Sequence, residues 1–280
     1  MDTVSKLQNI ATQVRRDVLR MVHSKNSGHP GGALGCADLL TALYFEVLHQ
    51  KEVFDMAGNN EDMFFLSNGH LSAVWYSVLS RKGYFPVKEL STFRAIDSRL
   101  QGHPATAEHI PGVRVASGSL GQGLSVAAGA ALGKKMSGDK NIVYCLCGDG
   151  ELQEGQIWEA AMFATARCID NLIAIVDYNG KQIDGPVDSV ISLGNLKAKW
   201  EAFGWIALET NGNDMRLLLN TLNEAKHNTG NAKPVVILMK TIMGMGVDFM
   251  MDDHRWHGSA PDNKQLELAL QQLPVTLGDY

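Results

Sequence analysis

The chain has 280 residues, of which 45% are hydrophobic and 20% are charged, and its formal net charge is −5. This hydrophobic fraction is typical of a folded globular chain and argues against intrinsic disorder. No tract of five or more Lys or Arg residues occurs, so a basic surface for nucleic acid is excluded. No apolar run approaches the roughly 20 residues that span a bilayer, and the N-terminus lacks the pattern of a signal peptide.

Glycine is frequent and charge is scarce in this chain. The 28 glycines exceed the usual share of about 7%, and the charged fraction lies below the usual value of about 25%. We therefore expect many tight turns and a surface that a ligand or another chain covers. The four cysteines fit no zinc pattern, so we expect buried free thiols in a reducing cytoplasm: Cys36, Cys145, Cys147 and Cys168.

The first half of the chain combines helical periodicity with one short apolar run. Apolar residues recur at gaps of three and four near the N-terminus, which predicts a helix that ends before Gly28 and Pro30. In chain order we predict a helix over 4–21, a helix with Leu39, Leu43 and Val47 on one side, a strand over 63–66, a helix over 71–79, a polar excursion over 81–112 and a small-residue helix after the loop 117–123.

Three more strands are predicted in the second half, over 142–147, 172–177 and 235–239. Each is apolar without alternation, which is typical of strands buried on both faces of a parallel sheet. Helices are predicted between them, over 154–166 and 215–226. This alternation predicts an α/β fold, with a doubly wound, mostly parallel sheet that carries helices on both faces. We see no linker or repeat and expect one domain over residues 1–280.

A metal and phosphate site is predicted where two of these strands end. Gly148-Asp149-Gly150 directly follows one strand, and Asn179 follows the next. Ligands bind at the carboxyl ends of such strands, and Asp and Asn oxygens suit Mg²⁺ that also binds phosphate oxygens. The alternative interpretation is a β-turn followed by an Asx-turn.

The spacing from Asp149 to Asn179 resembles the diphosphate-binding motif of thiamine diphosphate enzymes, and the chain resembles the N-terminal part of transketolase over roughly residues 5–265. Seven blocks occur in the family's order: Ser27 to Gly31, Leu66 to His70, Gly102-His103-Pro104, Gly118 to Gly123, Gly148-Asp149-Gly150, Asp184-Gly185 and His257-Gly258. The resemblance implies the thiamine diphosphate-binding fold. It also implies transfer of a two-carbon ketol unit from a ketose phosphate to an aldose phosphate, within pentose phosphate metabolism.

Site residues follow from the resemblance position by position. It implies Asp149, Asn179 and the main-chain oxygen of Lys181 as ligands of Mg²⁺, with Ca²⁺ or Mn²⁺ as alternatives. It implies His70 and Gly150 near the cofactor diphosphate, together with Asn179 through the metal. Gly118 and Leu120 match the loop near the cofactor ring. His257 matches a residue at both cofactor and substrate, and His29 and His103 match histidines at the donor hydroxyls.

Imidazole fits these roles, because it can exchange protons with sugar hydroxyls near pH 7. A single histidine beside glycine is usually a loop or surface residue, but four in such contexts at predicted element ends favour a pocket. We expect the other five to be structural or on the surface: His23, His49, His109, His227 and His254.

Three features depart from the family pattern or have a plainer explanation. Ser119 stands where many transketolases have proline, and Lys181 stands where an apolar residue is common. The segment 105–110 does not match the pattern, and we expect it to reshape the donor pocket. Glu154 matches an acidic residue near the dimer interface, although a favourable helix dipole explains a Glu there equally well.

Transketolases are about twice this long, and their second half supplies the glutamate at the thiamine pyrimidine and the arginines for substrate phosphate. We therefore expect either a truncated chain or a naturally split enzyme, in which a separate C-terminal subunit completes a heterotetramer with two copies of each chain. Alternative hypotheses are half of a 2-oxo acid dehydrogenase or deoxyxylulose-phosphate synthase, and a cofactor-binding homologue without catalysis.

Overall fold

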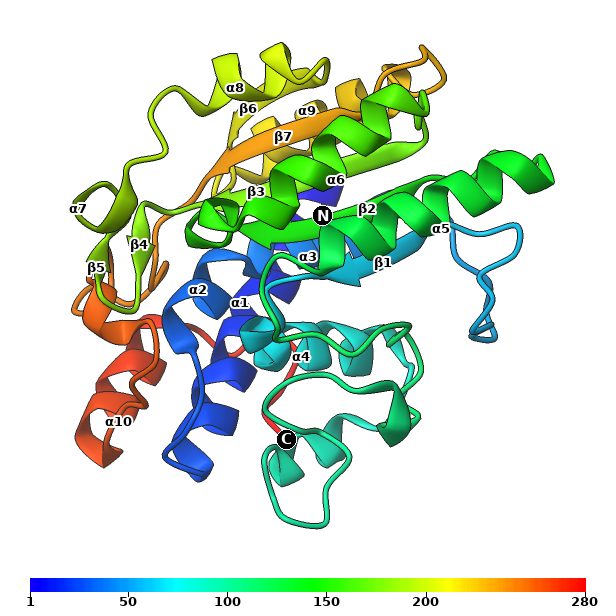
Figure 1. Ribbon diagram of the computed structural model, residues 1–280. Helices are drawn as coiled ribbons and strands as arrows, with labels where there is room; N and C mark the ends of the chain where they lie inside the picture. The colour runs from blue at the N-terminus through cyan, green and yellow to red at the C-terminus, as the bar shows by residue number, and fades with distance from the viewer.

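The computed structural model describes residues 1–280 and is organised around a five-stranded parallel sheet (Figure 1). The strand order is β1-β2-β3-β7-β6, and each neighbouring pair is parallel. The bounds are Met63–Leu66 for β1, Val143–Gly148 for β2, Leu172–Tyr178 for β3, Ile206–Asn211 for β6 and Val235–Lys240 for β7. The expectation of a doubly wound α/β fold with a mostly parallel sheet is confirmed.

Helices connect these strands and cover the sheet. The longer ones are α1 (Thr3–Ser24), α4 (Ser72–Lys82), α5 (Gly123–Ser137), α6 (Gly155–Ala166), α9 (Met215–His227) and α10 (Asn263–Gln272). The shorter ones are α2 (Pro30–Gly35), α3 (Ala37–Ala42), α7 (Val187–Ile191) and α8 (Leu196–Ala202). A small antiparallel hairpin, β4 (Lys181–Gln182) and β5 (Gly185–Pro186), follows β3. No helix is long and apolar enough to cross a membrane.

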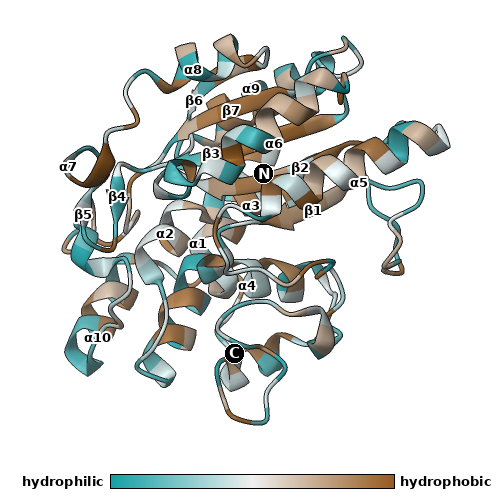
Figure 2. Ribbon diagram, viewed as in Figure 1, coloured by the Kyte–Doolittle hydropathy of each residue, from teal (hydrophilic) through white to brown (hydrophobic).

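The sheet is buried on both faces by two separate hydrophobic cores. On one face, α1, α3, α4 and α9 pack against alternate strand residues such as Phe64, Tyr144 and Ile173. On the other face, α5, α6 and α8 cover the intervening residues, such as Phe65 and Cys145. Figure 2 shows the resulting hydrophobic colour along β2 and β7. This two-sided burial explains why the strands read as apolar runs without alternation.

Two elements differ from the sequence-based prediction. The helix expected around Leu39, Leu43 and Val47 is divided into α2, α3 and a π-helical turn over Leu43–Val47. We did not predict β6, which is an edge strand. Only one of its six residues, Thr210, is buried, so it lacks the apolar signature of the central strands.

The cysteine prediction is correct for three residues and wrong for one. Cys36, Cys145 and Cys147 are buried free thiols. Cys168 is also free but exposed, because it follows the C-terminal end of α6 in a turn where its backbone adopts a left-handed conformation, with φ of 49°.

A buried ionic network anchors α1 to α4 beneath the sheet. Asp17 is fully buried and accepts hydrogen bonds from Ser77 Oγ at 2.7 Å and from Arg81 Nε and Nη2 at 2.8 and 2.7 Å. The Arg81 side chain is only 7% exposed. Neither charge can be solvated if its partner is removed, so the pair holds the two helices in one arrangement.

We expect Asp17→Asn to lower the free energy of unfolding by about 3–5 kcal/mol, because the Arg81 charge would remain buried without its partner. Urea denaturation followed by circular dichroism measures this loss. The matched control is Glu209→Gln, which removes a carboxylate from the exposed pair with Lys197 at 3.9 Å. The control should change stability by less than about 0.5 kcal/mol. Equal effects of the two variants would contradict a special role for the buried pair.

Candidate functional site

The loops at the carboxyl ends of β1, β2, β3 and β7 enclose a cavity of about 370 Å³. This is the edge at which a parallel α/β sheet binds ligands. Every residue that the sequence analysis assigned to the site lines this cavity: His29, His70, His103, Gly118, Leu120, Asp149, Gly150, Asn179, Lys181 and His257. They come from seven segments that are separated in sequence.

Four histidine rings form a cluster on one side of this cavity. The ring centroid of His29 lies 5.1 Å from that of His70, 6.3 Å from that of His103 and 5.7 Å from that of His257. The rings of His70 and His257 are 5.2 Å apart. His29 therefore lies at the centre of the group. Each ring is carried by a different loop, so only the tertiary fold brings them together.

Burial keeps these imidazoles uncharged near neutral pH. Desolvation, followed by the charge of His257, lowers the pKa of His29 to about 4. The same two causes lower the pKa of His70 to about 3. Desolvation also lowers the pKa of His103 and of His257. A neutral imidazole has one donor and one acceptor nitrogen, which suits contacts with hydroxyl groups.

Several buried polar atoms in and beside the cavity have no hydrogen-bond partner within the protein. They are the Nδ1 atoms of His29 and His257, Oδ1 of Asn68 and Oγ of Ser117. Buried polar atoms are normally satisfied by protein or by water, so each such atom needs an explanation. At the cavity, these atoms are free to bind a polar ligand. We did not single out Asn68 beyond its motif block or Ser117 beyond its place in the loop 117–123.

The loops after β2 and β3 are tied together by Asp149. Its Oδ1 accepts from Gly150 N at 2.7 Å, and its Oδ2 accepts from Gly180 N at 2.5 Å. Asn179 Oδ1 accepts from Lys181 N at 2.9 Å, which is an Asx-turn. The turn considered as an alternative in the sequence analysis is thus present. It does not replace a ligand role, because each of these oxygens has further lone pairs.

The donor set around Asp149 fits a hard divalent cation. Asp149 and the neighbouring Asp177 are each only 2% exposed, and neither belongs to an ion pair within the protein. Desolvation, followed by the charge of Asp177, raises the pKa of Asp149 to about 7. A carboxylate, an amide oxygen and a carbonyl oxygen are the ligands that Mg²⁺ or Ca²⁺ accepts. No cluster of three or more His, Cys, Asp or Glu side chains offers an alternative metal site.

We did not identify Glu151 from the sequence. It is a buried acid that holds three segments together. Its carboxylate accepts from Ser67 Oγ, from Gly121 N at 2.8 Å and from Gly148 N at 3.0 Å. It is 2% exposed. These three donors come from the end of β1, the loop 117–123 and the end of β2, so Glu151 fixes that loop at the cavity.

Gly118 in the loop 117–123 and Gly69, which packs against this loop, leave no room for a side chain. Gly118 has φ of 128°, and a Cβ atom there would lie 2.7 Å from His103 Cδ2. A Cβ on Gly69 would lie 2.6 Å from Gly118 N. Both positions therefore require glycine, because backbone and histidine rings approach each other closely.

Arg94 is a second residue that sequence reasoning missed. Its Nη1 donates to Ser27 Oγ at 2.9 Å, and its Nη2 lies 3.4 Å from the carbonyl oxygen of Gly102. Ser27 and Gly102 directly precede the turns that carry His29 and His103. Arg94 thus links those two turns. Arg94 lies alone in a polar stretch outside any motif block, so its local sequence does not indicate a role at the site.

The other residues that the sequence analysis discussed lie at the edge of the cavity or outside it. Glu154 lines the cavity, is exposed and precedes the first residue of α6 without a capping hydrogen bond from its side chain. Segment 105–110 contributes no residue to the cavity. The five histidines expected to be structural or on the surface also lie outside it: His23, His49, His109, His227 and His254.

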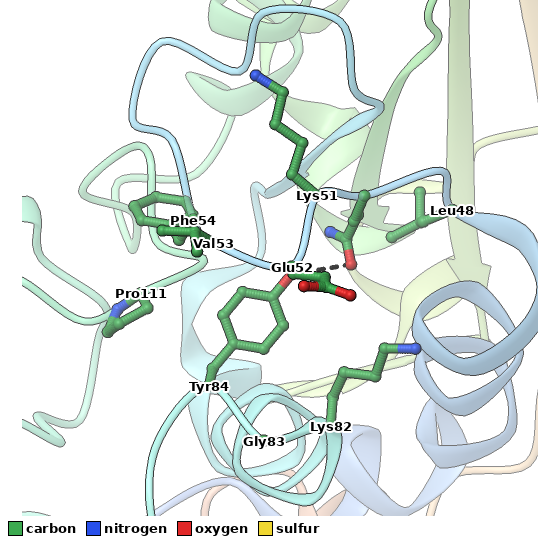
Figure 3. Close-up of a pocket in the computed structure, with 10 residues that line it drawn as sticks. Leu48, Lys51, Glu52, Val53, Phe54, Lys82, Gly83, Tyr84 and Pro111 are labelled. Carbon is green, nitrogen blue, oxygen red and sulfur yellow. Dashed lines mark hydrogen bonds between the residues drawn. The ribbon is translucent and has the colours of Figure 1, made fainter.

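A larger cavity of about 680 Å³ lies near the amino ends of the strands (Figure 3). The segment before β1 and the end of α4 form it, and Tyr84 donates a hydrogen bond to Gln50 Oε1 at 2.9 Å within it. None of the residues predicted for the site lines this cavity. Size alone therefore does not select the functional site; chemistry and position at the sheet edge do.

Comparison with known proteins shows relatives of similar length. The family model described as "Transketolase, thiamine diphosphate binding domain" matches residues 6–276. One subunit of the apulose-4-phosphate transketolase of Actinobacillus succinogenes is 38% identical over 269 residues, which cover 96% of either chain. The 6-deoxy-6-sulfo-D-fructose transketolase subunit SqwG of a Clostridium species is 39% identical and is covered over 87% of either chain.

Solved structures of transketolases are also similar to this chain. The crystal structure of transketolase from Campylobacter jejuni superposes with a TM-score of 0.88 at 34% sequence identity and covers 98% of this chain. The match covers only 43% of that transketolase, so this chain spans less than half of the single-chain enzyme. The sequence, the sheet and the arrangement of the cavity thus lead to one conclusion: the chain belongs to the transketolase family and corresponds to its N-terminal, thiamine diphosphate-binding section.

Proposed function

We propose that this chain is the N-terminal subunit of a two-chain transketolase. With a separate C-terminal subunit, it transfers a two-carbon ketol unit from a ketose phosphate to an aldose phosphate. The observation that carries the proposal is the convergence of four histidine rings and two buried acids without a basic partner on one cavity. Relatives of similar length are named as transketolase subunits, which supports a two-chain enzyme.

The residues divide into a metal–diphosphate side and a sugar side. Asp149, Asn179 and the main-chain oxygen of Lys181 would hold the divalent cation, with Gly150 allowing close approach of the diphosphate. His70 and His257 would donate to diphosphate oxygens, while Gly118 and Leu120 would contact the cofactor ring. Bound thiamine diphosphate supplies the electron sink for breaking and forming the C–C bond.

The chain's own contribution to the reaction is to orient sugar hydroxyls and to move their protons. His29 and His103 would contact the donor hydroxyls close to the reactive carbon, and His257 would also reach the substrate. Burial lowers the pKa of His29 to about 4 and also lowers that of His103, so both rings are neutral at pH 7 and each presents a nitrogen lone pair that can accept a hydrogen bond from a donor hydroxyl. Arg94 and Glu151 keep the loops that carry these groups in place.

The partner subunit would cover an apolar surface beside the cavity. On α6, Met162 and Phe163 are 54% and 41% exposed, and on α5 Val126 is 38% exposed. These two helices pack side by side, as Figure 1 shows. Both are apolar on the outer as well as the inner side, which is typical of helices that another chain covers. We infer an assembly of two chains of each kind.

We also propose a single domain and a cytoplasmic location for this chain. Residues 1–280 form one domain, since both hydrophobic cores rest on the same sheet. The protein acts in the cytoplasm, where its four thiols would stay reduced, as their free state suggests. The sugar phosphates used are set by the partner subunit, and an unusual ketose of a specialised pathway is one candidate donor.

Purified chain should bind thiamine diphosphate only when Mg²⁺ is present, and Asp149→Ala should abolish this metal-dependent binding by removing the charged ligand. Isothermal titration calorimetry with and without Mg²⁺ measures both effects. Asp188→Asn, an exposed acid on α7, serves as the control and should leave binding unchanged. Equal affinity of the Asp149 variant and the unchanged chain would argue against this cation site.

Ketol transfer should require both subunits and should be impaired by substitution of His103. We expect His103→Ala, assayed with the C-terminal subunit, to raise the KM for a ketose phosphate donor more than it lowers kcat, because a donor hydroxyl contact is lost. With a 2-oxo acid donor the same variant should have little effect. Full ketol transfer by the isolated chain would refute the two-chain proposal, and activity with 2-oxo acids alone would favour the alternative enzyme classes.

Charge introduced on α6 should weaken binding of the partner. We expect Phe163→Glu to reduce affinity for the C-terminal subunit by about tenfold or more, because a buried apolar contact becomes a desolvated charge. Analytical ultracentrifugation of the two subunits measures this. Val53→Glu is the matched control, since Val53 is 80% exposed and lies before β1 at the other end of the sheet. If only the control weakened association, the partner surface would lie elsewhere.

The clustered histidines should titrate far below their ordinary range. The pKa values of about 4 for His29 and about 3 for His70 lie below the unfolded value of about 6.5. Between these values the unfolded chain binds more protons, so folding becomes less stable as pH falls through this window. NMR titration of the imidazole C–H resonances, assigned with His29→Gln and His70→Gln, tests this. Midpoints near 6.5 would show that burial does not keep the rings neutral.

A further inference from the structure

Asp177 is the one acid at the cavity that has no assigned role. It lies near the end of β3, lines the cavity and is 2% exposed. Thr241 Oγ1, which follows β7, donates to its Oδ1, and Asn179 Nδ2 donates to its Oδ2 at 2.9 Å. The thiol of Cys36 also faces this carboxylate, from the residue between α2 and α3. Asp177 is therefore held by groups from three other segments.

The contact between Asp177 and Asn179 determines which way the Asn179 amide faces. An amide side chain has a carbonyl oxygen on one side and an NH₂ group on the other, so the two ends cannot be exchanged without changing every hydrogen bond. The carboxylate of Asp177 can only accept, which directs Nδ2 toward it. Lys181 N can only donate, and it lies 2.9 Å from Oδ1. Both contacts select the same orientation.

This orientation leaves one lone pair of Asn179 Oδ1 without a protein donor. The Asx-turn with Lys181 N uses one of the two lone pairs. The other is available to a cation beside Asp149, whose carboxylate lies 2.5 Å from Gly180 N in the same turn. If the amide were reversed, Nδ2 would face the cation and could not coordinate it.

Asp177 also contributes charge to the same position. Both Asp149 and Asp177 are buried, and the nearby Lys181 Nζ pairs with Asp252 instead, at 3.0 Å. Buried carboxylates without a cation are costly, and a divalent ion at Asp149 would offset both charges. Asp177 would therefore favour a divalent over a monovalent cation.

We propose that Asp177 is a positioning residue of the metal–diphosphate site, which orients the Asn179 amide toward the cation and adds a second negative charge behind it. This inference rests on the proposed function, because it assigns a role toward the cation that the function requires. Residues that orient metal ligands typically change metal affinity by about 10–100-fold when mutated.

The test measures metal affinity directly rather than activity. Mn²⁺ serves as the probe, and free Mn²⁺ is followed by electron paramagnetic resonance during titration of the full chain with thiamine diphosphate present. We expect Asp177→Asn to weaken Mn²⁺ binding by about 10–100-fold. Thr241 Oγ1 donates to Oδ1, which holds the carbonyl oxygen of the introduced amide there and turns its NH₂ group toward Asn179. This NH₂ group cannot accept from Asn179 Nδ2, so the Asn179 amide is free to reverse. Asp188→Asn is the matched control and should not change affinity.

The exchange variant combines Asp177→Asn with Asn179→Asp. It distinguishes a loss of side-chain orientation at position 179 from a general disruption of the site. The amide introduced at position 177 would donate its NH₂ group to the carboxylate introduced at position 179, which restores the hydrogen bond with reversed polarity and conserves the total charge. We expect this double variant to regain most of the lost Mn²⁺ affinity. A double variant as weak as Asp177→Asn would overturn the positioning role, as would unchanged affinity in the single variant.

Folding is monitored by circular dichroism for each variant. If Asp177→Asn does not fold, Thr241→Val provides the second test, because it removes the hydroxyl donor that fixes Asp177 Oδ1 and should still weaken Mn²⁺ binding. Unchanged Mn²⁺ affinity in a folded Thr241→Val chain would then refute the inference. If the unchanged chain takes up no Mn²⁺ at all, the proposed function fails and the inference fails with it. Binding by the unchanged chain but not by Asp149→Ala supports the function independently.

Discussion

The parallel hydrogen-bonded ladder fixes the position of Asp177 and of the loops that carry Asp149 and Asn179. In this ladder Gly148 of β2 pairs with Asp177 of β3, and Asp177 pairs with Met239 of β7. The loops that follow these strands must therefore leave the sheet at one edge. A shift of one residue would turn each strand's side chains to the opposite face, and both faces are occupied by tightly packed cores. The cores thus enforce the register, and the register brings Asp149, Asp177, Asn179 and His70 to one edge of the sheet.

Two pairs of buried aspartates differ in their surroundings. Asp17 and Asp38 are each bound by a buried arginine, Arg81 and Arg15, and hold helices together. Asp149 and Asp177 are equally buried but have no basic partner. Unsatisfied nitrogen atoms of His29 and His257 lie at the same cavity. An unpaired charge beside unsatisfied donors and acceptors is unfavourable in the isolated chain, and it is the state that binding of a cation and a diphosphate would relieve.

Sequence patterns predicted the central strands and the motif residues well but were weaker elsewhere. The strands β1, β2, β3 and β7 are apolar on both faces and stand out clearly, whereas the edge strand β6 has one buried residue and does not. Asp177, Glu151 and Arg94 escaped notice for a related reason. Their importance lies in contacts with segments more than 60 residues away for Asp177–Thr241, Glu151–Ser67 and Arg94–Ser27, and nothing in their local sequence indicates those contacts.

The sequence by itself determined the fold class, the family and the identity of the groups that line the cavity, because these depend on local periodicity and on ordered motif blocks. The tertiary structure decided how those groups work together. It placed His29 at the centre of four rings, left its Nδ1 without a partner and set the orientation of the Asn179 amide through Asp177. The physical reason is that desolvation and hydrogen-bond direction depend on neighbours in space. Those neighbours come from separate loops and meet only when the sheet has formed.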